Sequence, residues 1–242
     1  MRLEIPGTFN FRSIDGLWAG GTQIAPGRLY RSDALDRIGE AGRAELAEVG
    51  LQRIIDLRGE SEARALPDDV VGLGIEQMFL PIDTRGAATA EGDGLARLHA
   101  VYANMLDSDG GVLAEAVRSI ASAPGAVLVH CMAGKDRTGM VIALALEALG
   151  VERNDILDDY ELSQRHLEGL WLDQMLERLA GFGVPDSAEL RTVMAGSPRE
   201  LLVNAFEYLD ANYGSPTDYL RAHGLSEDEL EQLRAALLAQ PR

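Results

Sequence analysis

The chain has 242 residues, 46% hydrophobic and 25% charged, which is typical of a globular protein with a sizeable core. Its formal net charge of −17 argues against bulk electrostatic binding to nucleic acid or an anionic membrane, so an anionic ligand would need a local positive pocket. A single cysteine excludes internal disulfides, the N-terminus has no apolar signal core, and no run approaches the ~20 apolar residues of a membrane span. We expect one domain over 1–242, cytoplasmic by default.

Short strands and one helix are predicted in the first third of the chain. Turn-rich sequence around 10–12 and 27–32 favours a β-hairpin edge with solvated arginines. Helical spacing of apolar residues runs from Ile38 to Val49 and stops at Gly50. Two further strands are predicted at 53–58 and 77–83, the second leading into a flexible link over 84–94.

Strands and helices then alternate, and helices follow alone. The pattern predicts helices at 95–105 and 112–122, a buried strand at 126–129 and an apolar helix at 140–149, and this alternation predicts an α/β fold with a mostly parallel central sheet flanked by helices. After Val151 only helical patterns occur. They comprise an apolar stripe through Leu167, Leu170, Trp171, Gln174, Leu176 and Leu179, a helix at 199–213, and a last helix to about 238 that starts with a capping box at 226–229.

The residues 130–139, His-Cys-Met-Ala-Gly-Lys-Asp-Arg-Thr-Gly, lie between that buried strand and the apolar helix. A strand, a tight loop and a helix N-terminus form an anion site, because loop N–H groups and the helix dipole face the same space. Cys131 and Arg137 both fall in this loop. A thiolate beside a guanidinium suits attack on a phosphate monoester, with Cys131 as nucleophile and Arg137 holding two oxygens of the phosphoryl group. The N–H groups of Met132, Ala133 and Gly134 would bind the same oxygens.

Other interpretations of this segment fit less well. A lone cysteine is usually a small buried hydrophobe, but Lys135 and Arg137 would lower the pKa of this thiol. Asp136 stands where a Walker A loop has Ser or Thr, and one cysteine with scattered histidines offers no zinc-ligand spacing. A sulfurtransferase loop would not predict Arg-Thr-Gly entering a helix. We therefore expect phosphate transfer, without a metal or organic cofactor.

The ten-residue segment resembles the motif of the cysteine-dependent phosphatases, and Ala-Gly-Lys-Asp-Arg at 133–137 resembles one branch, the atypical bacterial tyrosine phosphatases (type B or lipid-phosphatase-like). The resemblance implies a cysteine-phosphatase-like fold and hydrolysis of phosphotyrosine, and often of phosphoserine, phosphothreonine and phosphoinositides. It also implies that helices over about 151–223 cover the active site as a lid. Phosphorylated protein or phosphoinositide would be the substrate.

The resemblance extends to single residues near the loop. It implies that Thr138 hydrogen-bonds the thiolate and that Asp83, at the end of a strand, is the general acid, with the loop residue Asp136 as the competing candidate or an assistant on alkyl substrates. Lys135 would add positive charge and could meet a second phosphate, and His130 would order the loop.

Four further residues are candidates for supporting the loop. Similar segments in the family place Arg12 and Arg31 close to the phosphate site. Asp56 and Arg58 would either hydrogen-bond the loop backbone or form a surface ion pair worth little.

Two other functions stay open at this point. The first is a phosphatase of a small phosphorylated metabolite or nucleotide, because the loop recognises only the phosphate. The second is a non-catalytic phosphate-binding module, which the complete set of Cys131, Arg137 and Thr138 disfavours.

Overall fold

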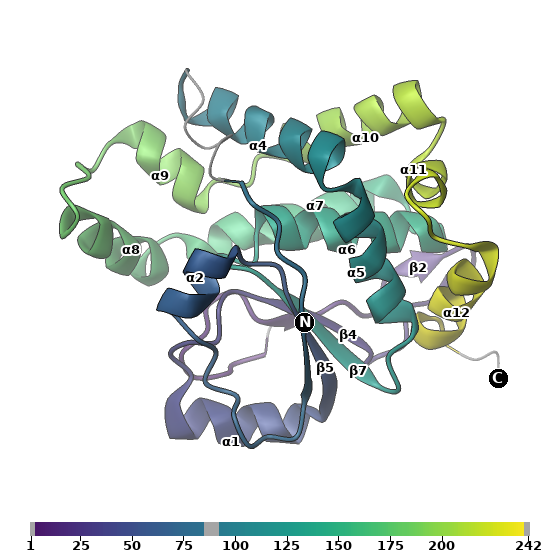
Figure 1. Cartoon of the computed structure of the whole chain (residues 1–242), viewed down its shortest axis with the longest axis horizontal. Helices are drawn as coiled ribbons and strands as arrows, with labels where there is room; N and C mark the ends of the chain where they lie inside the picture. The colour runs from purple at the N-terminus through teal and green to yellow at the C-terminus, as the bar shows by residue number, and fades with distance from the viewer. Residues whose placement is uncertain (1–2, 85–91, 240–242) are drawn as a thin grey trace.

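A computed structural model describes residues 3–84 and 92–239 (Figure 1). The strands are β1 (Arg12–Ser13), β2 (Trp18–Ala19), β3 (Thr22–Gln23), β4 (Leu29–Ser32), β5 (Leu51–Asp56), β6 (Glu76–Phe79) and β7 (Ala126–His130). The helices are α1 (Gly39–Val49), α2 (Glu60–Ala65), α4 (Gly94–Ser108), α5 (Gly110–Ala121), α6 (Asp136–Leu149), α7 (Arg153–Leu167), α8 (Leu170–Ala180), α9 (Ala188–Ala195), α10 (Arg199–Tyr213), α11 (Pro216–Ala222) and α12 (Glu227–Leu237).

The central sheet has the strand order β1-β4-β7-β5-β6. Strands β4, β7, β5 and β6 are parallel to one another, and in this sheet only the two-residue edge strand β1 is antiparallel. The carboxyl ends of parallel strands share one edge of a sheet, which is where α/β proteins bind ligands. The phosphate loop therefore leaves the central strand β7 at the edge where such sites form.

Alternating side chains of β7 place the sheet between two apolar layers. Val127 and Val129 face the larger core, which contains α4 to α7 and α10 to α12, while Ala126 and Leu128 face a smaller core covered by α1. Figure 1 shows α1 alone on its side of the sheet and the other long helices across from it. The prediction of a mostly parallel α/β sheet flanked by helices is confirmed.

Most predicted elements exist with ends shifted by a few residues. α1 ends at Gly50, whose φ of 71° gives the left-handed cap expected there, and Ser226 and Glu229 form the capping box of α12. The apolar helix α6 begins at Asp136, inside the ten-residue segment, so the first turn of the helix is part of the phosphate loop. Residues 85–91 of the expected link lie outside the described part of the chain.

The hairpin expectation is right about pairing and wrong about solvation. β1 and β4 pair antiparallel with Arg12 opposite Arg31, yet these side chains are 2% and 1% exposed. Within the described ranges, no helix is both long and apolar enough to cross a membrane.

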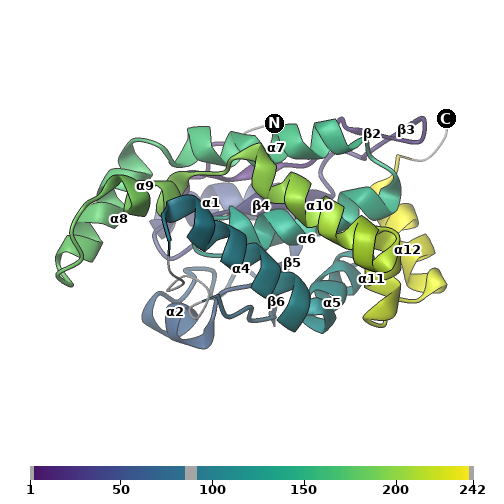
Figure 2. The ribbon, with the colours of Figure 1, turned by 90° about the horizontal axis from the view of Figure 1, so that it is seen from above.

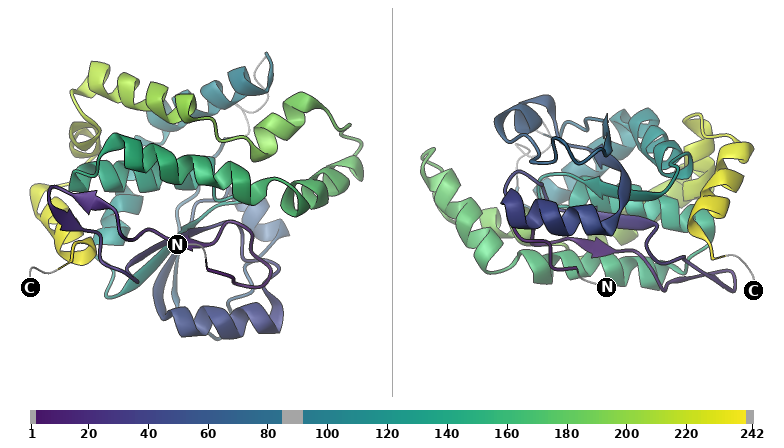
Figure 3. Two further views of the ribbon diagram at one scale, coloured as in Figure 1. Left: turned by 180° about the vertical axis from the view of Figure 1, so that it is seen from behind. Right: turned by 90° about the horizontal axis from the view of Figure 1, so that it is seen from below.

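The segment after Val151 divides into two parts. Buried residues of α7, α10 and α11 join the main core, and α10 lies beside α4 (Figure 2). Helices α8 and α9 lie at one end of the molecule, as the view from behind in Figure 3 shows. There α9 packs against α4, and both helices contribute to a third apolar cluster. That cluster contains Trp171 and Leu172, whereas Leu170 of the predicted stripe is 63% exposed. The lid expected over about 151–223 stays a prediction, and within that range only α8 and α9 of the described helices belong to this third cluster rather than to the main core.

Candidate active site

The phosphate loop is held against the neighbouring strand by its own backbone. Gly134 has a φ of 65°, and a Cβ there would lie 2.2 Å from the carbonyl oxygen of Ser32. Only glycine fits both the conformation and this close approach. The N–H of Ala34 donates to the Met132 carbonyl at 3.1 Å, which fixes the loop to the end of β4.

Cys131 lies at the start of the loop, 2% exposed, at the foot of a pocket of about 190 Å³. Burial would raise the pKa of its thiol, but Arg137 and the Thr138 hydroxyl outweigh burial and lower it. The Thr138 hydroxyl is fully buried and has no other hydrogen-bond partner of standard geometry within the described chain. The Cys131 sulfur is therefore the acceptor to which it can donate. This shift makes the thiolate form more accessible than in a free cysteine.

Arg137 is oriented by a carboxylate that the sequence did not single out. Its two terminal nitrogens donate to Glu62 of α2, at 2.6 Å to Oε2 and 2.9 Å to Oε1. Burial would raise the pKa of Glu62, but the hydrogen bonds and charge of Arg137 lower it, so the carboxylate stays ionised. Nε–H and one terminal N–H of Arg137 have no acceptor among the described residues. They are available to oxygens of a phosphoryl group.

Behind the loop, two buried arginines share one carboxylate. Arg12 and Arg31 contact the two oxygens of Asp159 at 2.8 and 2.6 Å, and Arg31 donates to the Gly134 carbonyl at 2.8 Å. Burial would raise the pKa of Asp159, but the two guanidinium groups outweigh it and lower the pKa to about 2. Helix α7 is therefore tied to the loop by a paired and hydrogen-bonded charge network.

Asn10 supports the same side of the loop. Its amide nitrogen donates to the carbonyls of Ala133 and Gly134 at 2.9 and 3.1 Å. Its backbone N–H donates to the buried carboxylate of Asp33 at 2.9 Å. Burial raises the pKa of Asp33 to about 6, although the N–H groups of Asn10 and Phe9 act in the opposite direction.

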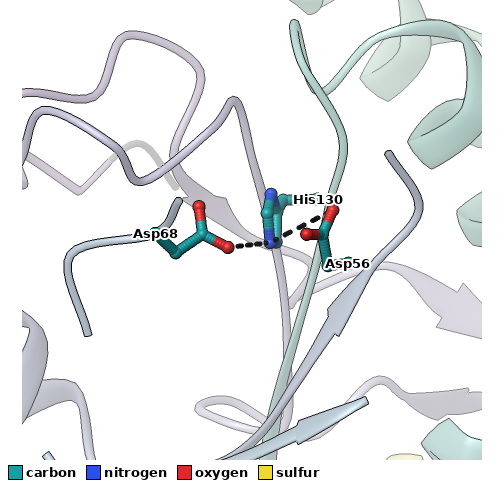
Figure 4. Close-up of side chains that lie close together, drawn as sticks. All are labelled: Asp56, Asp68 and His130. Atoms are coloured by element: carbon teal, nitrogen blue, oxygen red, sulfur yellow. Dashed lines mark ion pairs between the residues drawn. The ribbon is translucent and has the colours of Figure 1, made fainter. Parts of the chain in front are cut away.

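His130 is surrounded by carboxylates under the loop (Figure 4). Its Nε2 lies 3.1 Å from Asp68 and 3.8 Å from Asp56, while Nδ1 lies 3.3 Å from the Cys131 carbonyl. Burial would lower the pKa of His130, but Asp68 and Asp56 outweigh burial and raise it. Asp56, Asp68 and His130 lie close enough together to bind a metal ion. However, the Arg58 guanidinium lies 2.8 Å from both carboxylates and already supplies a positive charge to them.

The two expectations for Asp56 and Arg58 were both wrong in detail. Arg58 is 1% exposed, so the pair is not a surface ion pair. Its guanidinium contacts Asp56, Asp68 and the Leu66 carbonyl rather than the loop backbone. Among the described residues, the hydrogen bonds and ion pairs of the two side chains do not reach the loop backbone, and Asp56 lies 3.8 Å from His130 at the start of the loop.

Lys135 does not point toward a second phosphate. Its ammonium group donates to the carbonyls of Val193 and Gly196 at 3.1 and 2.6 Å and lies 3.1 Å from Asp136. The side chain is 1% exposed. A lysine of the phosphate loop therefore holds the C-terminal end of α9, whose Val193 and Met194 line the pocket.

The two candidate acids occupy different places. Asp136 lines the pocket together with Cys131 and Arg137. Asp83 is exposed, and the pocket lining includes its neighbour Thr84 instead. Burial, and to a smaller extent the charge of Asp83, raise the pKa of Asp109 at the far end of α4. Strand β6 ends at Phe79, and the chain that follows passes the site, with the Ile82 carbonyl 3.4 Å from a terminal nitrogen of Arg137. The role of Asp83 as main acid stays a prediction.

Several residues at this site were missed as functional residues. Glu62 is 75 positions from its partner Arg137, and Tyr102, which contacts Asp136, is 34 positions away. Neither belongs to a local motif. Asn10, Asp159 and Ser163 lie in segments that resemble the family, which was the signal that could have identified them.

Comparison with known proteins agrees with this geometry. Residues 3–239 match a family model described as "Tyrosine phosphatase family". The chain is 32% identical to the triple specificity protein phosphatase PtpB of Mycobacterium tuberculosis, over 97% of this chain and 98% of that one. It is 30% identical to a tyrosine-protein phosphatase of Nostoc commune, over 89% and 76%. Among solved structures, TpbA of P. aeruginosa is 18% identical, with a TM-score of 0.40, over 72% and 90%. The match across nearly the whole chain, which includes the loop that carries Cys131 and Arg137, shows that the protein belongs to the tyrosine phosphatase family.

Proposed function

We propose that this chain hydrolyses phosphotyrosine in proteins through a phosphocysteine intermediate. The observation that carries the proposal is the arrangement of Cys131 and Arg137 at one pocket, with a lowered thiol pKa and a guanidinium oriented by Glu62. Apolar walls formed by Leu98, Val101 and Trp171 suit an aromatic ring above the loop. They support an aryl phosphate as the substrate.

In the first step the Cys131 thiolate attacks phosphorus, an S–P bond forms and the P–O bond to the leaving group breaks. Arg137 and the loop N–H groups stabilise the charge on the transferring phosphoryl group. Asp136 donates a proton to the departing oxygen. In the second step Asp136 accepts a proton from water as the water oxygen attacks phosphorus, and the S–P bond breaks to release phosphate.

The proposal is tested by turnover of an aryl phosphate and a phosphotyrosine peptide. Cys131→Ser and Arg137→Ala should each abolish turnover while the variants stay folded, and EDTA should leave the wild type unchanged. Full activity of Cys131→Ser would contradict the mechanism.

A wider substrate range is supported by the similarity to the mycobacterial relative, which is a triple specificity protein phosphatase. We therefore include phosphoserine, phosphothreonine and phosphoinositides as proposed substrates. A panel of these compounds with sugar phosphates and nucleotides, ranked by kcat/KM, separates this range from the alternative of a small-metabolite phosphatase.

A further inference from the structure

Two buried tyrosines extend from the acid at the pocket into the core. Tyr102 of α4 is 3% exposed and Tyr160 of α7 is 1% exposed. Their hydroxyl oxygens are 2.7 Å apart, and the Tyr102 hydroxyl lies 3.2 Å from Oδ1 of Asp136. The contacts form a chain from Tyr160 through Tyr102 to the carboxyl group.

The direction of the hydrogen bonds follows from the protons available. Burial raises the pKa of both tyrosines well above 10, so both hydroxyls keep their protons. Each hydroxyl has one proton to donate. With Asp136 as the acceptor, Tyr102 donates to the carboxyl group and Tyr160 donates to Tyr102.

This arrangement makes the two oxygens of Asp136 unequal. Both Tyr102 and Lys135 approach Oδ1, at 3.2 and 3.1 Å. Oδ2 has no donor among the residues that the structure describes, so it is the oxygen on which an acid proton would reside. A carboxylic acid that must deliver its proton to a leaving oxygen needs one fixed rotamer with the proton on the substrate side.

Tyr160 in turn has a fixed place. A Cβ at Gly139, in the first turns of α6, would lie 3.0 Å from the Tyr160 ring, so the glycine allows the helix to pack directly on that ring. The two tyrosine rings meet edge-on, with centroids 6.3 Å apart. The hydroxyl chain is thus held by rigid helices on both sides.

We propose that Tyr102 is a positioning residue for the catalytic acid: its hydroxyl fixes the Asp136 carboxyl group through Oδ1 and so directs Oδ2 at the leaving oxygen. The inference rests on the proposed function, in which Asp136 is the acid. It assigns Tyr102, which has no role in the phosphate loop motif, a specific effect on substrates with poor leaving groups.

The test compares kcat/KM for dinitrophenyl phosphate, a phosphotyrosine peptide and a phosphoserine peptide in the Tyr102→Phe variant. An acid matters most for poor leaving groups, and general acid catalysis contributes about 10²–10⁴-fold, so partial loss of alignment should slow the phosphoserine peptide about tenfold. Dinitrophenyl phosphate, whose leaving group departs without protonation, should change little. The ratio of the two rates on one preparation is independent of the folded fraction.

Tyr219→Phe is the matched control, because Tyr219 is also fully buried and its hydroxyl donates to the Leu106 carbonyl of the same helix α4. It should leave the ratio of rates unchanged. The double variant Tyr102→Phe/Asp136→Asn should be no slower on phosphoserine than Asp136→Asn alone. Suppose that Asp136→Asn shows the expected leaving-group dependence. Equal slowing of all substrates by Tyr102→Phe, or additive losses in the double variant, would then overturn the inference. If Asp136→Asn shows no such dependence, the acid assignment of the proposed function fails, and the role of Tyr102 with it.

Discussion

At the scale of single residues, the site depends on ion pairs in which the arginines are buried and Glu62 alone of the carboxylates is half-buried. Arg137 meets Glu62, and Arg12 with Arg31 meets Asp159, each within 3 Å. A buried ion pair contributes little net stability, but removing one partner leaves an uncompensated charge in the interior. These pairs therefore fix geometry, and their substitutions have large effects.

Asp159→Asn tests this for the network behind the loop. The pKa of Asp159 is about 2 in the folded chain against an ordinary 3.8, so its carboxylate stabilises the fold fully above pH 4 and loses this contribution as the pH falls toward 2. We expect the variant to lose about 3–5 kcal/mol of unfolding free energy at pH 7. The difference in unfolding free energy between wild type and variant should shrink by about 2 kcal/mol in acid, because each unit of difference between the folded and unfolded pKa is worth about 1.36 kcal/mol.

Urea unfolding at a series of pH values from 7 to 2 measures this difference. Asp158→Asn is the control, because the neighbouring side chain is 67% exposed and pairs at the surface with Arg199. A gap between wild type and Asp159→Asn that does not narrow in acid would contradict the assignment.

At the scale of elements, the sequence predicted what is local and missed what is distant. The apolar strand, the loop and the following helix are contiguous, so periodicity and residue spacing were enough to locate Cys131 and Arg137. The burial of Arg12 depends on a carboxylate 147 positions away, and no local pattern reports that distance. The stripe through α8 failed at Leu170 because a preceding residue, Gly169, has a φ of 84° and starts the helix with a different face inward.

The α8–α9 segment should limit access of oxidants to Cys131. Its residues Trp171, Val193 and Met194 line the pocket, and the third apolar cluster together with Lys135 holds the segment in place. Leu176→Ala removes a side chain that is 8% exposed in that cluster, and should cost about 2 kcal/mol or more of local stability. More frequent local opening should speed oxidation of Cys131 by peroxide severalfold.

Loss of activity with time in dilute peroxide gives the oxidation rate. Leu170→Ala, at a position 63% exposed on the same helix, is the matched control and should oxidise like the wild type. Equal rates in both variants would mean that the two helices do not shield the thiolate.

At the scale of the whole molecule, the protein binds an anion against its own field. The chain carries a formal net charge of −17, and Arg137 is the cation that lines the pocket together with Glu62 and Asp136. The local site overcomes the net repulsion only at short range, where the guanidinium and the loop N–H groups meet the phosphate. The phosphate itself is therefore not attracted at long range, and the charge of the residues that flank it in the substrate becomes important.

Two phosphotyrosine peptides of equal length, one flanked by glutamates and the other by lysines, test this. The Debye length falls from about 30 Å at 0.01 M salt to about 10 Å at 0.1 M, so salt should screen repulsion of the acidic peptide and attraction of the basic one. We expect kcat/KM to rise severalfold with salt for the acidic peptide and to fall for the basic peptide. The kcat of either peptide should change little with salt, because the chemical step takes place inside the pocket, where the phosphate already contacts Arg137 and the loop. Parallel salt dependences for the two peptides would show that the global charge has no part in substrate selection, and that the pocket alone determines it.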